Sequence, residues 1–121
     1  MTIRRLKTYT GSQGFVYQYY FVGKRAAVTP GQNESAASEY IFDVTSDRKL
    51  TYAVSIFLPQ NVVAAWAKAH GRSLGDSEQY AAVKMRLFRG FDELEEMQVK
   101  GRELHIDLHF LDESLAALGV D

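Results

Sequence analysis

The sequence predicts an α+β fold, in which an antiparallel β-meander of three to four strands packs in two layers on two or three C-terminal helices. Alternating aromatic and β-branched residues fill the first half of the chain, a pattern typical of strands. Apolar residues at helical spacing follow in the second half, after Pro59. Strands followed by helices favour this fold over a parallel βαβ sheet.

Length and composition indicate one globular unit. The chain has 121 residues and a mass of 13.7 kDa, so we expect residues 1–121 to form a single domain around one core. Seven Phe, seven Tyr and one Trp at a net charge of −1 exclude a disordered chain.

The first half contains the candidate strands. Residues 15–22, FVYQYYFV, are largely apolar on both alternating faces, so we expect this strand to be covered on more than one side. Residues 39–45 and 50–58 form a predicted hairpin. Residues 4–10 can add an earlier strand, and the Pro-Gly-containing segment 28–38 is predicted to be a mobile loop.

The second half contains the candidate helices. Helical spacing predicts one helix over 60–70 and a longer one that begins at Asp76, as the N-cap of a capping box, and runs to about Met97. A short strand over 102–106 and a closing helix over 108–118 follow.

The long helix carries more apolar surface than a two-layer fold requires. One apolar arc is suited to the sheet, and a second arc holds Ala81, Met85 and Phe88, whereas a surface helix normally has a single apolar stripe. The first and third predicted helices can cover the surplus of this helix and of the 15–22 strand within the chain; otherwise a second subunit, a protein partner or an apolar ligand does so. We therefore expect a non-enzymatic interaction module with these three residues at its interface, a homodimer or a complex with another protein.

A small-molecule binding domain is the first alternative. Aromatic side chains can line a pocket between sheet and helices, and the candidates are Tyr17, Tyr19, Tyr52 and Trp66. The chain has no cysteine, no Gly-x-Ser-x-Gly elbow and no phosphate loop. We therefore expect no catalytic residues, no cofactor and no enzyme activity.

One short motif raises the question of a metal site. His105, Asp107 and His109 would share one face if their segment were a strand, and two imidazoles with a carboxylate suit a divalent metal. The leucine spacing favours a helix instead, with Asp107 as its cap. We therefore expect no metal site.

A nucleic-acid accessory domain is the second alternative. It would use basic residues beside Tyr17, Tyr19 and Tyr20, namely Arg4, Arg5, Lys7, Lys24 and Arg25. The isoelectric point near 6.3 lacks the basic character of such domains, so we do not expect nucleic acid as a partner. The polar start MTIRRLKTYT and the absence of a long apolar run predict a cytoplasmic protein without a membrane span.

Overall fold

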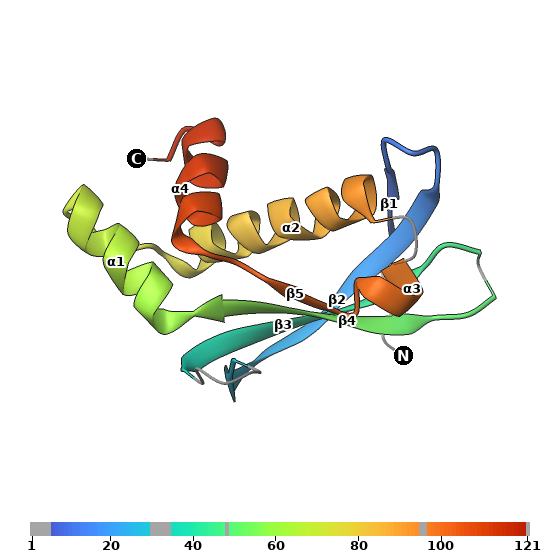
Figure 1. Ribbon diagram of the computed structural model, residues 1–121, viewed down its shortest axis with the longest axis horizontal. Helices are drawn as coiled ribbons and strands as arrows, with labels where there is room; N and C mark the ends of the chain where they lie inside the picture. The colour runs from blue at the N-terminus through green and yellow to red at the C-terminus, as the bar shows by residue number, and fades with distance from the viewer. Residues whose placement is uncertain (1–5, 30–34, 48, 95–96, 121) are drawn as a thin grey trace.

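The computed structural model describes residues 6–29, 35–47, 49–94 and 97–120, and its α+β architecture is the predicted one (Figure 1). Within these residues the strands are β1 (Lys7–Thr10), β2 (Val16–Val28), β3 (Ala36–Thr45), β4 (Tyr52–Pro59) and β5 (Glu103–His105). The helices are α1 (Gln60–His70), α2 (Asp76–Glu93), α3 (Met97–Lys100) and α4 (Leu108–Ala117).

The sheet follows the chain order β1-β2-β3-β4-β5. The first three pairings are antiparallel, as the predicted meander requires. The hairpin of β3 and β4 is confirmed, with Phe42 opposite Val54. The last pairing, between β4 and β5, is parallel, because α1 and α2 carry the chain back before β5 begins.

A β-bulge divides β2. Phe21 pairs with Phe42, and Gly23 pairs with the preceding Ile41, so Val22 is the additional residue. The strand does not end at Val22, as the sequence pattern predicted, but continues to Val28. The predicted loop over 28–38 is shorter at both ends, because β2 includes Val28 and β3 begins at Ala36. Its residues 30–34 lie outside the described part of the chain.

The core lies between the sheet and the helices, which Figure 1 shows on one side of it. Tyr40, Phe42 and Ile56 point from the sheet to this side, where Leu87 and Phe91 of α2 and Leu111 and Leu115 of α4 are buried with them; all seven belong to one apolar cluster. Among the described residues, the helices lie on this side of the sheet and none covers the opposite face.

Helix ends are set by local hydrogen bonds. The N-cap of α2 is Gly75 and not Asp76, because the Glu78 carboxylate accepts the Gly75 N–H at 2.9 Å. The helix ends at Glu93, four residues before the predicted end at Met97, and Leu94 is extended. Asp107 caps α4 as predicted, accepting the Phe110 N–H at 2.8 Å.

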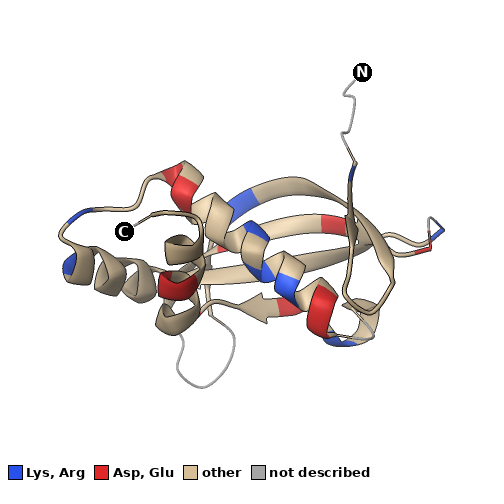
Figure 2. Ribbon diagram, turned by 90° about the horizontal axis from the view of Figure 1, so that it is seen from above, with Lys and Arg blue, Asp and Glu red and all other residues tan. Residues whose placement is uncertain are grey.

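Charged residues along α2 are segregated. Figure 2 shows basic residues in the middle of this helix and acidic residues at both of its ends. Within the described ranges, no helix has the length and hydrophobicity needed to span a membrane.

Candidate interaction surface

The second apolar arc of α2 is partly covered within the chain. Ala81, Met85 and Phe88 are each half-buried. The Phe88 ring stacks on Tyr9 of β1, with centroids 4.4 Å apart and planes 4° from parallel. The hairpin of β1 and β2 therefore covers part of the second apolar arc from within the chain.

A groove remains between α2, α4 and β1. Its volume is about 330 Å³, and Met85, Phe88 and Phe110 line its apolar part. Charged groups of Arg89, Asp92, Glu93 and Glu113 surround it.

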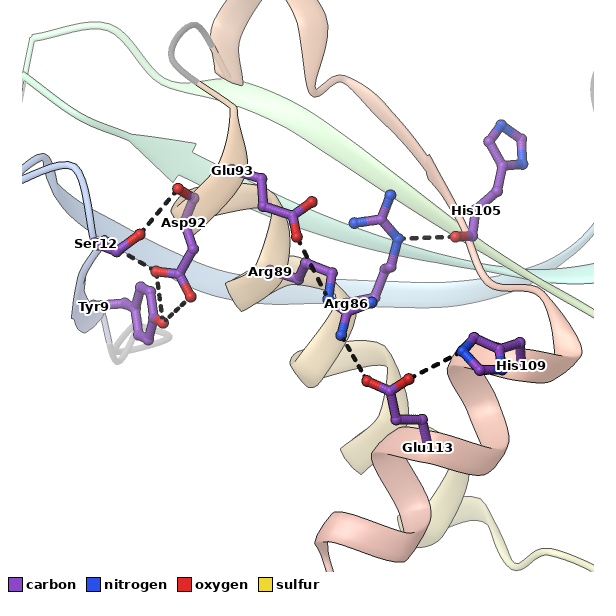
Figure 3. A network of polar contacts seen from close by, with 9 residues as sticks. All are labelled: Tyr9, Ser12, Arg86, Arg89, Asp92, Glu93, His105, His109 and Glu113. Atoms are coloured by element: carbon purple, nitrogen blue, oxygen red, sulfur yellow. Dashed lines mark hydrogen bonds and ion pairs between the residues drawn. The ribbon is translucent and has the colours of Figure 1, made fainter.

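Asp92 at the end of α2 fastens the hairpin of β1 and β2 (Figure 3). The Tyr9 hydroxyl donates to both carboxylate oxygens of Asp92 at 3.0 and 2.9 Å, and the Ser12 N–H donates to Oδ1 at 3.0 Å. Burial, and secondly the hydrogen bond to Asp92, raise the pKa of Tyr9. These contacts hold the hairpin over the helix.

Arg89 joins α2 to α4 on the other side of the groove (Figure 3). Its Nη2 donates to Glu113 Oε1 at 3.1 Å, and its Nε lies 3.8 Å from Glu93 Oε1. The guanidinium also covers the Phe110 ring, 4.6 Å from its centroid. Arg89 thus balances part of the negative charge that three carboxylates place around this groove.

The four aromatic residues predicted to line a pocket are core residues. Tyr17, Tyr19, Tyr52 and Trp66 are all buried. Tyr17 stacks on Phe91, with centroids 4.2 Å apart, and burial is the main cause that raises the pKa of Tyr52 to about 12. Trp66 also lines a depression of about 270 Å³ beside His70 and His109.

The histidines have different partners, although His70 and His109 line the same depression. His105 stacks on Phe57, His109 pairs with Glu113 at 3.1 Å, and His70 Nε2 lies 2.8 Å from Asp112 Oδ1. The carboxylate of Asp107 is used as the α4 cap. Within the described ranges, no group of three or more His, Cys, Asp or Glu side chains is arranged to hold a metal ion.

The basic residues considered for nucleic-acid binding are divided. Lys24 pairs with Tyr40 and Arg25 with Glu39, so they lie on opposite faces of the sheet. Arg25 Nε donates to Glu39 at 2.8 Å. Arg4 and Arg5 lie outside the described residues, and Tyr17 and Tyr19 are buried. The described residues thus do not gather this set on one surface.

Several exposed apolar residues lie on β2. Phe21, Val22 and Val28 are 38, 48 and 55% exposed. β1 pairs only with residues 16–19 of β2, so from Phe21 onward β2 has β3 on one side and no described strand on the other. We call residues 21–28 the free edge of β2.

Sequence reasoning missed the free edge because the run after Val22 has no apolar alternation. The adjacent charges of Lys24 and Arg25, inside an otherwise apolar run, were the available signal. Such charges are common on strands at the edge of a sheet.

Comparison with known proteins adds no family. Neither protein-family models, nor curated proteins, nor solved structures match this chain.

Proposed function

We propose that this protein is a non-enzymatic interaction module that self-associates through the free edge of β2. The observation that carries the proposal is the length of this edge, which exposes Phe21, Val22 and Val28 along eight residues of strand. An edge strand presents unpaired backbone N–H and C=O groups, and an added strand satisfies them. Apolar side chains beside those groups favour such an addition.

Residue register favours a second copy of the chain as the added strand. Two copies of one edge pair antiparallel around a two-fold axis, and residues directly opposite lie on the same face. An axis at Ala26 pairs residues 24–28 of the two copies, with Lys24 opposite Val28 of the second copy and Arg25 opposite its Ala27. Phe21 and Val22 lie beyond this pair on the same edge. Like charges then avoid one another, whereas an axis at Lys24 or Arg25 would bring them together.

Neighbouring residues fit this register. Ala26 is exposed and small, so two backbones can approach at the axis without a steric clash. Arg25 already pairs with Glu39, which reduces the positive charge along the edge. An interface built around one strand pair is small, so we expect weak, concentration-dependent dimers.

Charge substitutions at the axis test the proposal. We expect sedimentation equilibrium to show dimers of the wild-type chain at high concentration. Ala26→Glu and Ala26→Lys should each weaken dimerisation by about tenfold or more, because two like charges would face each other across the axis. A mixture of the two variants should restore dimers, since opposite charges then meet.

Ala116→Glu is the matched control, because Ala116 is exposed on α4, away from the edge. It should dimerise like the wild type. A wild-type chain that stays monomeric at high concentration contradicts the proposal. Dimers of unchanged strength in both Ala26 variants, or a mixture no stronger than either variant alone, contradict the assigned edge.

A further inference from the structure

A second candidate site is a pocket at the opposite end of α2 from the hairpin. It has a volume of about 500 Å³ and lies between α1, the start of α2 and the ends of β2, β3 and β4. This volume is within the range of small-molecule sites, about 300–1,000 Å³. Its apolar walls come from Leu58, Val63, Ala64, Ala67 and Leu74.

Two opposite charges line the same pocket. Lys24 reaches it from β2, and Asp76 reaches it from the first turn of α2. Both side chains belong to exposed residues. Among the ion pairs of the described residues, none joins Lys24 to Asp76.

A buried hydroxyl lies close to both charges. Tyr40 is 2% exposed, its ring centroid is 5.4 Å from Lys24 Nζ, and the Lys24 side chain also acts on its hydroxyl through a hydrogen bond. Burial raises the pKa of Tyr40 most; Lys24 lowers this pKa and Asp76 raises it, so both charges are near the hydroxyl.

We infer that this pocket binds a small zwitterion with an aliphatic group, the chemistry of a free branched-chain amino acid. The Asp76 carboxylate would receive its ammonium group, the Lys24 ammonium would receive its carboxylate, and Leu58, Val63 and Leu74 would contact its side chain. A simple fatty acid would satisfy Lys24 but would be repelled by Asp76. A simple amine would meet the reverse problem.

Isothermal titration with L-leucine tests the inference, with isocaproate and isoamylamine as analogues that each lack one charge. We expect leucine to bind with a dissociation constant in the range of about 1 mM or tighter, and each analogue to bind at least about tenfold more weakly. Equal binding of leucine and either analogue, or no binding of leucine at about 10 mM, would overturn the inference.

Two variants locate the site. Lys24→Gln and Asp76→Asn should each weaken leucine binding by about tenfold, whereas Lys100→Gln and Glu103→Gln, at exposed positions outside the pocket, should leave it unchanged. Leucine binding that is insensitive to both pocket variants would place the ligand elsewhere and overturn the assignment. Thermal unfolding of each variant shows whether it is folded at the titration temperature.

The inference does not rest on self-association. Ala26→Glu removes the proposed dimer contact but none of the pocket-lining residues, so this variant should bind leucine like the wild type. Failure of one proposal is therefore distinguishable from failure of the other.

Discussion

Individual residues show how polar groups are kept inside this fold. Glu39 is 7% exposed and lies on the sheet face opposite the helices. Its carboxylate accepts Arg25 Nε at 2.8 Å and Ser55 Oγ at 2.6 Å. The hydrogen bond from Arg25, the largest cause, lowers the pKa of Glu39 below its ordinary 4.5, against the effect of burial. The ionised form is therefore the one that the folded state stabilises.

Glu39→Gln should reduce the free energy of unfolding by about 1 kcal/mol near neutral pH, because Arg25 and Ser55 lose a charged acceptor and Arg25 is largely solvated. The stabilisation by the wild-type carboxylate is complete above its unfolded pKa and is lost as the pH falls through the lower folded pKa. The difference between wild type and variant should therefore shrink as the pH is lowered below about 4.5.

Urea unfolding at several pH values measures this difference. Glu103→Gln, at an exposed position on β5, is the control and should have little effect. A difference that grows in acid would show that the carboxylate of Glu39 does not stabilise the fold in its ionised form.

Gly11 permits a close approach that other residues would prevent. A Cβ atom at this position would lie 2.7 Å from the Phe91 carbonyl oxygen, and that oxygen belongs to the backbone of α2. Gly11→Ala should therefore destabilise the protein by about 1–3 kcal/mol, through strain at the contact between hairpin and helix.

Gly23 provides the comparison for Gly11 in thermal unfolding. A Cβ at Gly23 meets nothing within 4 Å, so Gly23→Ala should be neutral or stabilising, by up to about 1 kcal/mol. If both alanine variants melt like the wild type, the close contact at Gly11 is not a constraint on the fold.

At the scale of elements, sequence periodicity predicted the helices and strands whose formation depends on residues close together in the chain. It predicted α1 over 60–70 and the hairpin of β3 and β4, because each has its own apolar face and its own turn. It did not predict the end of α2 at Glu93, where the chain turns into α3. Met97 is buried after that turn, and a Cβ at Gly90 of α2 would lie 3.5 Å from Met97 Sδ, a contact that helical spacing does not contain.

The sequence alone was sufficient to predict the N-cap of α4. Asp107→Ala should cost about 1 kcal/mol, because the Phe110 N–H loses its acceptor, whereas Asp107→Ser should retain most of the stability. Urea unfolding of the two variants checks this. Equal stability of the alanine and serine variants would show that the side chain of Asp107 does not act as the cap.

At the scale of the whole molecule, the predicted surplus of apolar surface is unevenly distributed. On α2, Phe88 is stacked by Tyr9, while on β2 Val22 and Val28 stay about half exposed. The sequence could not distinguish apolar residues that are covered within the chain from those that stay exposed, because Phe88 is covered by a hairpin that folds over the helix. The hairpin is held in this position by contacts between Ser12 and Asp92, which are 80 residues apart in the chain.

Self-association through this remaining surface should couple stability to concentration. If only the folded chain dimerises, mass action stabilises it, so a tenfold rise in protein concentration should raise the wild-type melting midpoint by a few degrees. The melting midpoint of Ala26→Glu should rise less across the same series, because its dimers are weaker. Differential scanning fluorimetry or calorimetry measures both midpoints. A wild-type midpoint that does not change with concentration would contradict dimerisation. An equal rise in the variant would contradict dimerisation at the free edge of β2, because stability would then not depend on contacts made by Ala26.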